Sequence, residues 1–145
     1  MKRGVKALLI IIGILIGVFL IIQLVPFGHE HANPAIVSKP NWDSVQTETL
    51  AKRACYDCHS NETTWPWYSN IAPISWLVQK DVNKGRKIVN FSDWNTFIGM
   101  TKDMVVQINK GKMTPFYYVW LHPTAKLSAA ENQQLIQGLY ATAQK

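Results

Sequence analysis

This sequence of 145 residues has few charged side chains, no internal repeat and no sustained alternation of apolar and polar residues. Charged residues make up 17% and apolar residues 48% of the chain, so a disordered chain is excluded. The missing alternation argues against β-strands, and the sequence predicts an all-α fold. The net charge of +6 comes with no basic stripe interleaved with aromatic side chains, so we expect no nucleic-acid partner.

Much of the apolar excess lies in one run from Ala7 to Val25, in which Gln23 is the only strongly polar residue. At about 1.5 Å per residue, a helix of this length matches the hydrocarbon core of a bilayer. The run is longer than the apolar core of a usual signal peptide and no A-x-A site follows, so we favour an uncleaved transmembrane anchor. Lys2, Arg3 and Lys6 precede it, which predicts a single-pass protein of the cytoplasmic (inner) membrane facing the periplasm or cell exterior.

Cysteine is also scarce, and both cysteines lie in Cys55-Tyr56-Asp57-Cys58-His59. This C-x-x-C-H pattern is typical of a site where haem is attached covalently. The thiols of Cys55 and Cys58 add to the two haem vinyl groups, and His59 supplies one axial nitrogen to the iron. The sequence therefore predicts one covalent haem c, with His59 as a metal ligand.

Two other interpretations of the cysteines are a dithiol–disulfide redox pair and half of a zinc site. The redox pair usually needs a βαβ context, which this sequence lacks. A zinc site would need two histidines, yet all except His59 lie far from the thiols in the sequence. We favour haem over both.

We predict three parts: a membrane anchor over residues 1–27, an extended linker over 28–42 and a haem-binding domain over 43–145. Pro34 and Pro40 disfavour helix in the linker. The linker also contains His29 and His31, which we interpret as solvated residues rather than ligands of a metal or a second haem.

The domain is expected to contain helices over 43–54, 73–90, 92–110 and 129–143. Polar side chains and a glycine mark the expected helix ends: Asp43 or Thr47, Ser92, Gly111, and a capping box formed by Ser128 and Glu131. The first of these helices leads directly into Cys55. The basic residues Lys80, Lys84, Arg86 and Lys87 are interpreted mainly as a solvated face.

Aromatic residues follow the cysteine motif closely, in Trp65-Pro66-Trp67-Tyr68. A buried haem needs a lining of low polarity, which also helps to set its potential. We therefore predict that Trp65, Trp67 and Tyr68 form part of the haem wall. An ordinary small core without a haem is the alternative.

Met113 is the predicted sixth ligand, because it follows a helix in a loop made rigid by Pro115. A thioether suits haem iron, and Met/His coordination raises the potential. The alternatives are an open site or one of the following residues: His122, His29, His31, Met100 and Met104. His122, which precedes Pro123, is interpreted as a turn residue.

The chain resembles a family of small, membrane-anchored bacterial haem-binding domains related to cytochrome c. The matching pieces are the anchor, Asn33-Pro34, Cys55-x-x-Cys58-His59, Trp65-Pro66-Trp67-Tyr68, Gly111-Lys112-Met113, Tyr118-x-x-x-His122-Pro123 and Leu127-Ser128. The resemblance implies a helical, cytochrome-c-like domain with one haem and a periplasmic location. It also implies a distal methionine in a G-x-M-P-P pattern, where this chain has Thr114 in place of the first proline.

These features favour an electron carrier tethered to the membrane, with redox proteins as partners and no small-molecule substrate. A haem-based sensor or an accessory subunit of a redox complex is the main alternative. A peroxidase-like enzyme would need acid and base groups at an open iron site, and no such set is evident, so we predict no catalytic residues.

Overall fold

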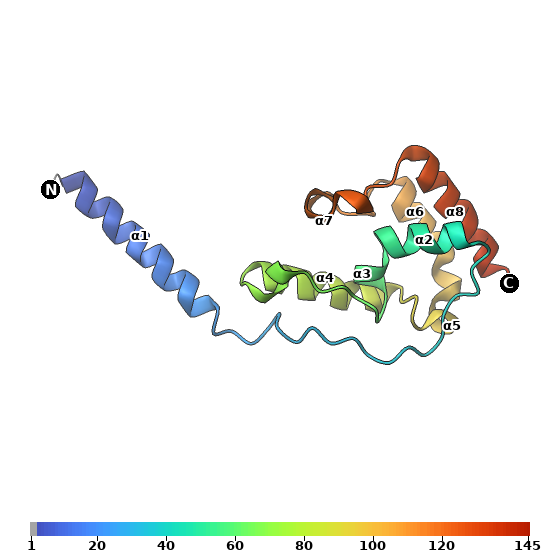
Figure 1. Cartoon of the computed structure of the whole chain (residues 1–145), viewed down its shortest axis with the longest axis horizontal. Coiled ribbons are helices and arrows are strands. Elements are labelled where there is room, and N and C mark those ends of the chain that lie inside the picture. The colour runs from blue at the N-terminus through green and yellow to red at the C-terminus, as the bar shows by residue number, and fades with distance from the viewer. Residues whose placement is uncertain (1–2) are drawn as a thin grey trace. The chain divides into compact units, whose positions relative to one another are not determined.

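The computed structural model describes residues 3–145, which fold into helices and form no strand (Figure 1). The α-helices are α1 (Arg3–Ile22), α2 (Val45–Ala54), α3 (Tyr56–His59), α4 (Ile74–Ile88), α5 (Trp94–Phe97), α6 (Thr101–Asn109), α7 (Phe116–Leu121) and α8 (Ala129–Ala143). The 3₁₀ turns are η1 (Trp67–Asn70), η2 (Ile98–Met100) and η3 (Pro123–Ala125). The all-α prediction is confirmed.

Helix α1 contains most of the predicted anchor, and its side chains are exposed along its length. By length and composition it can cross a membrane, and a signal sequence near the N-terminus has the same properties. Of the predicted anchor, Met1 and the basic residue Lys2 lie outside the described residues.

The chain divides into two compact units, which we describe separately. The anchor unit comprises the residues up to His31 together with Trp65–Asp81. The motif unit comprises Ala32–Thr64 and Val82–Lys145, and it contains the cysteine motif. Helix α4 begins in the anchor unit and ends in the motif unit.

The core of the motif unit forms around aromatic side chains close to the cysteine motif. The ring of Tyr56 stacks on Phe91 at 5.4 Å, and Phe91 stacks on Trp94 at 5.7 Å between ring centroids. These rings pack with Leu50, Ala51, Val89, Leu135 and Leu139, all of which are buried. The middle of the motif is therefore fixed by the hydrophobic core.

Helices α2 and α8 pack closely where Gly138 meets Thr47. A Cβ at position 138 would overlap the Thr47 side chain, so glycine is needed for this approach. Ser44 caps α2 by accepting a hydrogen bond from the Thr47 backbone N–H at 3.2 Å. The prediction of Asp43 or Thr47 as the cap is wrong, because the Thr47 hydroxyl is buried and bonded to Ser44.

The single helix predicted over 92–110 is wrong, because the segment forms α5, η2 and α6 in succession. Ser92 does not cap this segment: its buried hydroxyl accepts a hydrogen bond from the Asn61 N–H at 2.9 Å. Gly111, with φ of +63°, ends α6 as predicted. The capping box of Ser128 and Glu131 is also confirmed, and α8 has the predicted bounds.

The part of the linker in the motif unit is bound along its length. Asn33 donates to the Thr63 carbonyl at 2.9 Å, and Asn61 donates to the Ala35 carbonyl at 2.8 Å. Farther along, the N–H groups of Val37 and Ser38 both donate to the Ser92 carbonyl. This extended segment therefore lies against the turn that follows the motif.

Candidate haem-binding site

Cys55 joins α2 to α3, and Cys58 lies one helical turn farther along, within α3. The carbonyl of Cys55 accepts hydrogen bonds from the N–H groups of Cys58 at 3.2 Å and His59 at 2.9 Å. Residues three apart on a helix share a face, so this turn presents both thiols on one side. The two cysteines are partly buried and are not joined in a disulfide.

The imidazole of His59 is oriented by the backbone just after α4. Its Nδ1 lies 3.1 Å from the Val89 carbonyl oxygen, and its own carbonyl accepts from the Phe91 N–H at 2.8 Å. Burial lowers the pKa of His59, while hydrogen bonds to the backbone of Val89 and Gly85 offset part of that shift. A neutral ring that donates from Nδ1 keeps the Nε2 lone pair for a metal ion.

Gly85 lets α4 pack directly on the cysteine motif. A Cβ at this position would overlap the Cys58 carbonyl and lie 3.2 Å from the Cys58 Cβ. Because the clashing atoms include backbone, a larger residue would displace α4 or the motif. Gly85 was not predicted from the sequence, where an isolated glycine in a helix shows no sign of its long-range neighbour.

The thiol of Cys55 is shielded by protein, although part of the residue reaches the surface. Burial raises the pKa of this thiol from 9.0 to about 12. The residue also packs against the hydrophobic core. The thiolate is therefore strongly disfavoured at Cys55 in the folded chain.

The segment that contains Met113 is attached to the cysteine motif at two places. The hydroxyl of Thr114 donates to the Ala54 carbonyl at 3.4 Å, next to Cys55. Farther along, the Tyr118 hydroxyl on α7 donates to Asp57 Oδ2 at 2.6 Å. The loop and α7 are thus held beside the turn that presents the thiols.

Asp57 is a second residue of the site, after Gly85, whose contacts were not predicted from the sequence. Besides the bond from Tyr118, its Oδ1 accepts from the Thr64 N–H at 3.0 Å and its carbonyl accepts from the Thr63 hydroxyl at 2.7 Å. The sequence contains no signal for these contacts, since Tyr118 lies 61 positions away.

The structure also places the alternative sixth ligands. His122 stacks on Tyr118 with ring centroids 4.4 Å apart, at the end of α7. Met100 and Met104 pack against the hydrophobic core of the motif unit. Met113 is 39% exposed in the loop before α7. Of the methionines after the cysteine motif, Met113 is therefore the one not held in the core.

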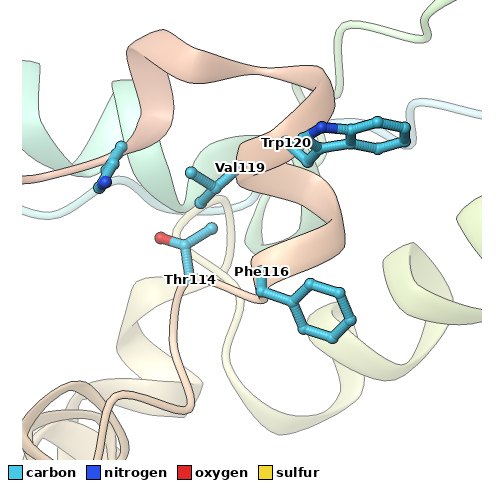
Figure 2. Close-up of a pocket in the computed structure, with 5 residues that line it drawn as sticks. Thr114, Phe116, Val119 and Trp120 are labelled. Atoms are coloured by element: carbon cyan, nitrogen blue, oxygen red, sulfur yellow. The ribbon is translucent and has the colours of Figure 1, made fainter.

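A hollow of about 640 Å³ lies beside this loop, lined by Thr114, Phe116, Val119, Trp120 and Lys126 (Figure 2). The rings of Phe116 and Trp120 are 84% and 82% exposed. In Figure 2 both rings extend outward from α7, while Thr114 lies on the loop before the helix and Val119 on the helix itself. An open and largely apolar surface thus adjoins the loop that contains Met113.

The predicted wall residues Trp65, Trp67 and Tyr68 belong to the anchor unit. Their role beside a haem stays a prediction. In the same unit His31 is held rather than solvated: it stacks on Trp65 with centroids 4.6 Å apart, and its Nε2 lies 2.9 Å from the Ser69 carbonyl oxygen.

Arg86 is held by four hydrogen bonds rather than pointing into solvent. Its Nε donates to the Ser60 carbonyl and its Nη1 to the Ala32 carbonyl. Its Nη2 donates to the side-chain oxygens of Asn33 and Thr63. It therefore joins the linker to the turn after the motif, and its interpretation as part of a solvated face is wrong.

The donor set at the motif fits a covalent haem better than a metal ion alone. Among residues 3–145, no three His, Cys, Asp or Glu side chains gather as they would around a zinc ion. Two thiols on one helical face, next to an imidazole with an oriented Nδ1, would suit two covalent links and one axial nitrogen.

Comparison with known proteins supports the same cofactor. No curated protein and no solved structure matches the chain. The model of the haem-binding domain family matches residues 17–141, which cover most of the chain. The protein is therefore a member of the haem-binding domain family.

Proposed function

We propose that the protein is a membrane-tethered c-type cytochrome with one haem, which carries electrons on the periplasmic side of the inner membrane. The observation that carries the proposal is the His59 ring, fixed by the Val89 carbonyl beside two thiols on one helical turn. In this proposal α1 is the retained anchor, and redox proteins of the membrane or periplasm are the partners.

Each residue of the site has a separate part in this function. Cys55 and Cys58 bind the porphyrin through thioethers, each formed when a thiol adds S and H across a vinyl group. His59 binds through Nε2, because its Nδ1 is engaged by Val89. The bound haem supplies one-electron Fe(III)/Fe(II) chemistry. Met113 would supply a thioether sulfur to the iron, and two strong ligands from the protein would keep reorganisation of the site small.

The attachments of the Met113 segment favour a carrier over a haem-based sensor, an accessory subunit or a peroxidase. Thr114 bonds to Ala54, just before the motif, and Tyr118 bonds to Asp57, in its middle. A ligand fixed in this way closes the iron to small molecules, whereas a peroxidase or a gas sensor needs an exchangeable position.

The test is an optical and near-infrared spectrum of the membrane-extracted holoprotein, compared with Met113→Ala and His122→Ala. We expect Met113→Ala to lose the thioether-to-iron absorption, become high-spin, fall in potential and bind carbon monoxide. The wild type and His122→Ala should bind carbon monoxide poorly. An unchanged spectrum in Met113→Ala would reject Met113 as the ligand, and a denatured band without haem stain would reject covalent attachment.

A further inference from the structure

The end of α1 is fastened to a distant part of the anchor unit by Gln23. The side-chain amide donates from Nε2 to the Ala72 carbonyl at 3.0 Å, and its Oε1 accepts from the Ala72 N–H at 2.9 Å. The side-chain amide of Gln23 thus bonds both the N–H and the carbonyl of Ala72. The only strongly polar residue of the apolar run therefore joins α1 to the segment before α4.

Two further contacts in the anchor unit continue this attachment. Gly28, with φ of +92°, approaches Ser75 so closely that a Cβ would lie 2.8 Å from the Ser75 carbonyl carbon. His31 then stacks on Trp65 and bonds to Ser69. The residues after α1 are consequently held against 65–75 at three points rather than leaving the membrane as a free tether.

The segment fastened to α1 has the composition of a membrane interface. Residues 65–79 contain no charged side chain and no histidine, but they contain three tryptophans and a tyrosine. Several apolar side chains of the anchor unit outside α1 are exposed: Trp67 by 76%, Phe27 by 48%, and Ile74 and Leu77 by 43% each. A surface without charge and with exposed aromatic residues is unusual in water and typical of the headgroup region of a bilayer.

The exposed residues at the start of α4 have a spacing that suits a surface contact. Ile74 and Leu77 are three apart, so they lie on the same face of the first turn. The next residue at this spacing is the exposed Lys80, which is the first charged residue after the apolar stretch. A lysine at this position can keep its stem at the apolar boundary and place its ammonium group among lipid phosphates.

We propose that residues 65–80 form an interfacial collar that lies in the outer headgroup region of the lipid bilayer, with Trp67, Ile74 and Leu77 as its lipid-contacting residues. The proposal rests on the retained, spanning α1 proposed above, because Gln23, the residue after that helix, is hydrogen-bonded to Ala72 within the collar. It gives Trp67 a role different from the haem wall predicted for it. The collar would hold this part of the chain at a defined height on the membrane.

The experiment places a photoreactive amino acid at position 67, 120 or 14 of the full-length holoprotein in phosphatidylcholine–phosphatidylglycerol vesicles. Trp120 is the matched control, since it is a tryptophan on α7 with 82% exposure against 76% for Trp67. Ile14 on α1 reports whether the helix itself contacts lipid. After illumination, mass spectrometry measures the yield of lipid adducts at each position.

We expect lipid adducts at positions 14 and 67, with at least several-fold more at 67 than at 120. If lipid adducts form at position 14 while positions 67 and 120 both give only background yields, the collar is overturned and the anchor stands. Absence of adducts at position 14 would overturn the anchor and with it the collar. Cross-links from position 67 to the porphyrin or its attached peptide would overturn the collar in favour of the haem wall.

Discussion

Gly85 sets how closely α4 approaches the cysteine motif. The Cys58 carbonyl occupies the space where a side chain at position 85 would begin. The same helix leads to Val89, whose carbonyl orients His59. The absence of a side chain at position 85 therefore affects the positions of both a haem-binding cysteine and the axial histidine in the proposed site.

Replacing Gly85 with Ala should disturb the site without changing its chemistry. We expect a loss of about 1–3 kcal/mol in the free energy of unfolding, because the overlap is with backbone atoms. The yield of covalent haem should fall as well, measured by haem staining of the denatured protein. The control is Gly99→Ala, where nothing lies within 4 Å of an added Cβ. Equal stability and haem yield in the two variants would contradict the packing argument.

The cysteine motif was recognisable from the sequence because Cys55, Cys58 and His59 lie within five successive residues. Asp57 and Gly85 were not, since each acts through a partner far along the chain. The polar side chain of Asp57 within the motif gave no indication of the Tyr118 hydroxyl that bonds to it. Contacts of this kind depend on the tertiary fold rather than on local pattern.

At the scale of elements, α7 is a short helix whose position depends on a small number of polar contacts. Its residues Phe116 and Trp120 are exposed, so packing alone does not hold it. The bond from Tyr118 to Asp57 joins it to the motif, and Thr114 joins the preceding loop to α2. The distance between Met113 and the motif is therefore expected to depend on these bonds.

Tyr118→Phe removes the hydroxyl and keeps the ring that stacks on His122. We expect a loss of about 1.5–3 kcal/mol in stability, as for a hydrogen bond to a charged group. If Tyr118 positions Met113, carbon monoxide binding to the reduced protein should also increase. Tyr140→Phe, which removes an exposed hydroxyl from α8, is the control. A variant that loses stability but keeps the wild-type spectrum and ligand affinity would show a purely structural role.

Helix ends with local signals were predicted well, whereas helices shaped by tertiary contacts were not. The capping box of Ser128 and Glu131 and the bounds of α8 agree with the sequence pattern, because both partners lie within one turn. The predicted helix over 92–110 is broken, and its expected cap, Ser92, bonds to Asn61 instead. Helix α7 was not predicted, because a segment of six residues is too short to show helical periodicity.

At the scale of the whole molecule, Glu131 joins the capping of α8 to the helix that leads into the motif. Its side chain accepts from the Ser128 N–H at 2.7 Å and from Arg53 on α2 at 2.5 Å. The backbone bond from Ser128 and then the bond from Arg53 lower the pKa of Glu131 from 4.5 to about 2. The charged carboxylate therefore favours the folded chain.

This shift predicts how stability changes in acid. Above pH 4.5 the carboxylate is charged in both states and its contribution is complete. Between pH 4.5 and about 2 the unfolded chain binds a proton that the folded chain does not, so the contribution is lost as the pH falls. We expect Glu131→Gln to lower the melting temperature at pH 7, with the gap from wild type closing near pH 2. The control Glu48→Gln, which breaks the exposed pair with Lys52, should lower the melting temperature less. A difference in melting temperature between Glu131→Gln and wild type that does not change with pH would contradict the lowered pKa of Glu131.

The shielded thiol of Cys55 has a consequence for the order of events in biogenesis. Burial raises the pKa of this thiol to about 12, so the thiolate, which is the reactive form, is strongly disfavoured at pH 7. In the proposed c-type protein, the thioether at Cys55 must therefore form while the thiol is still accessible, before α2 packs against its neighbours. Haem loading would then be an early maturation step, and the chain would complete its fold around a porphyrin that it already carries.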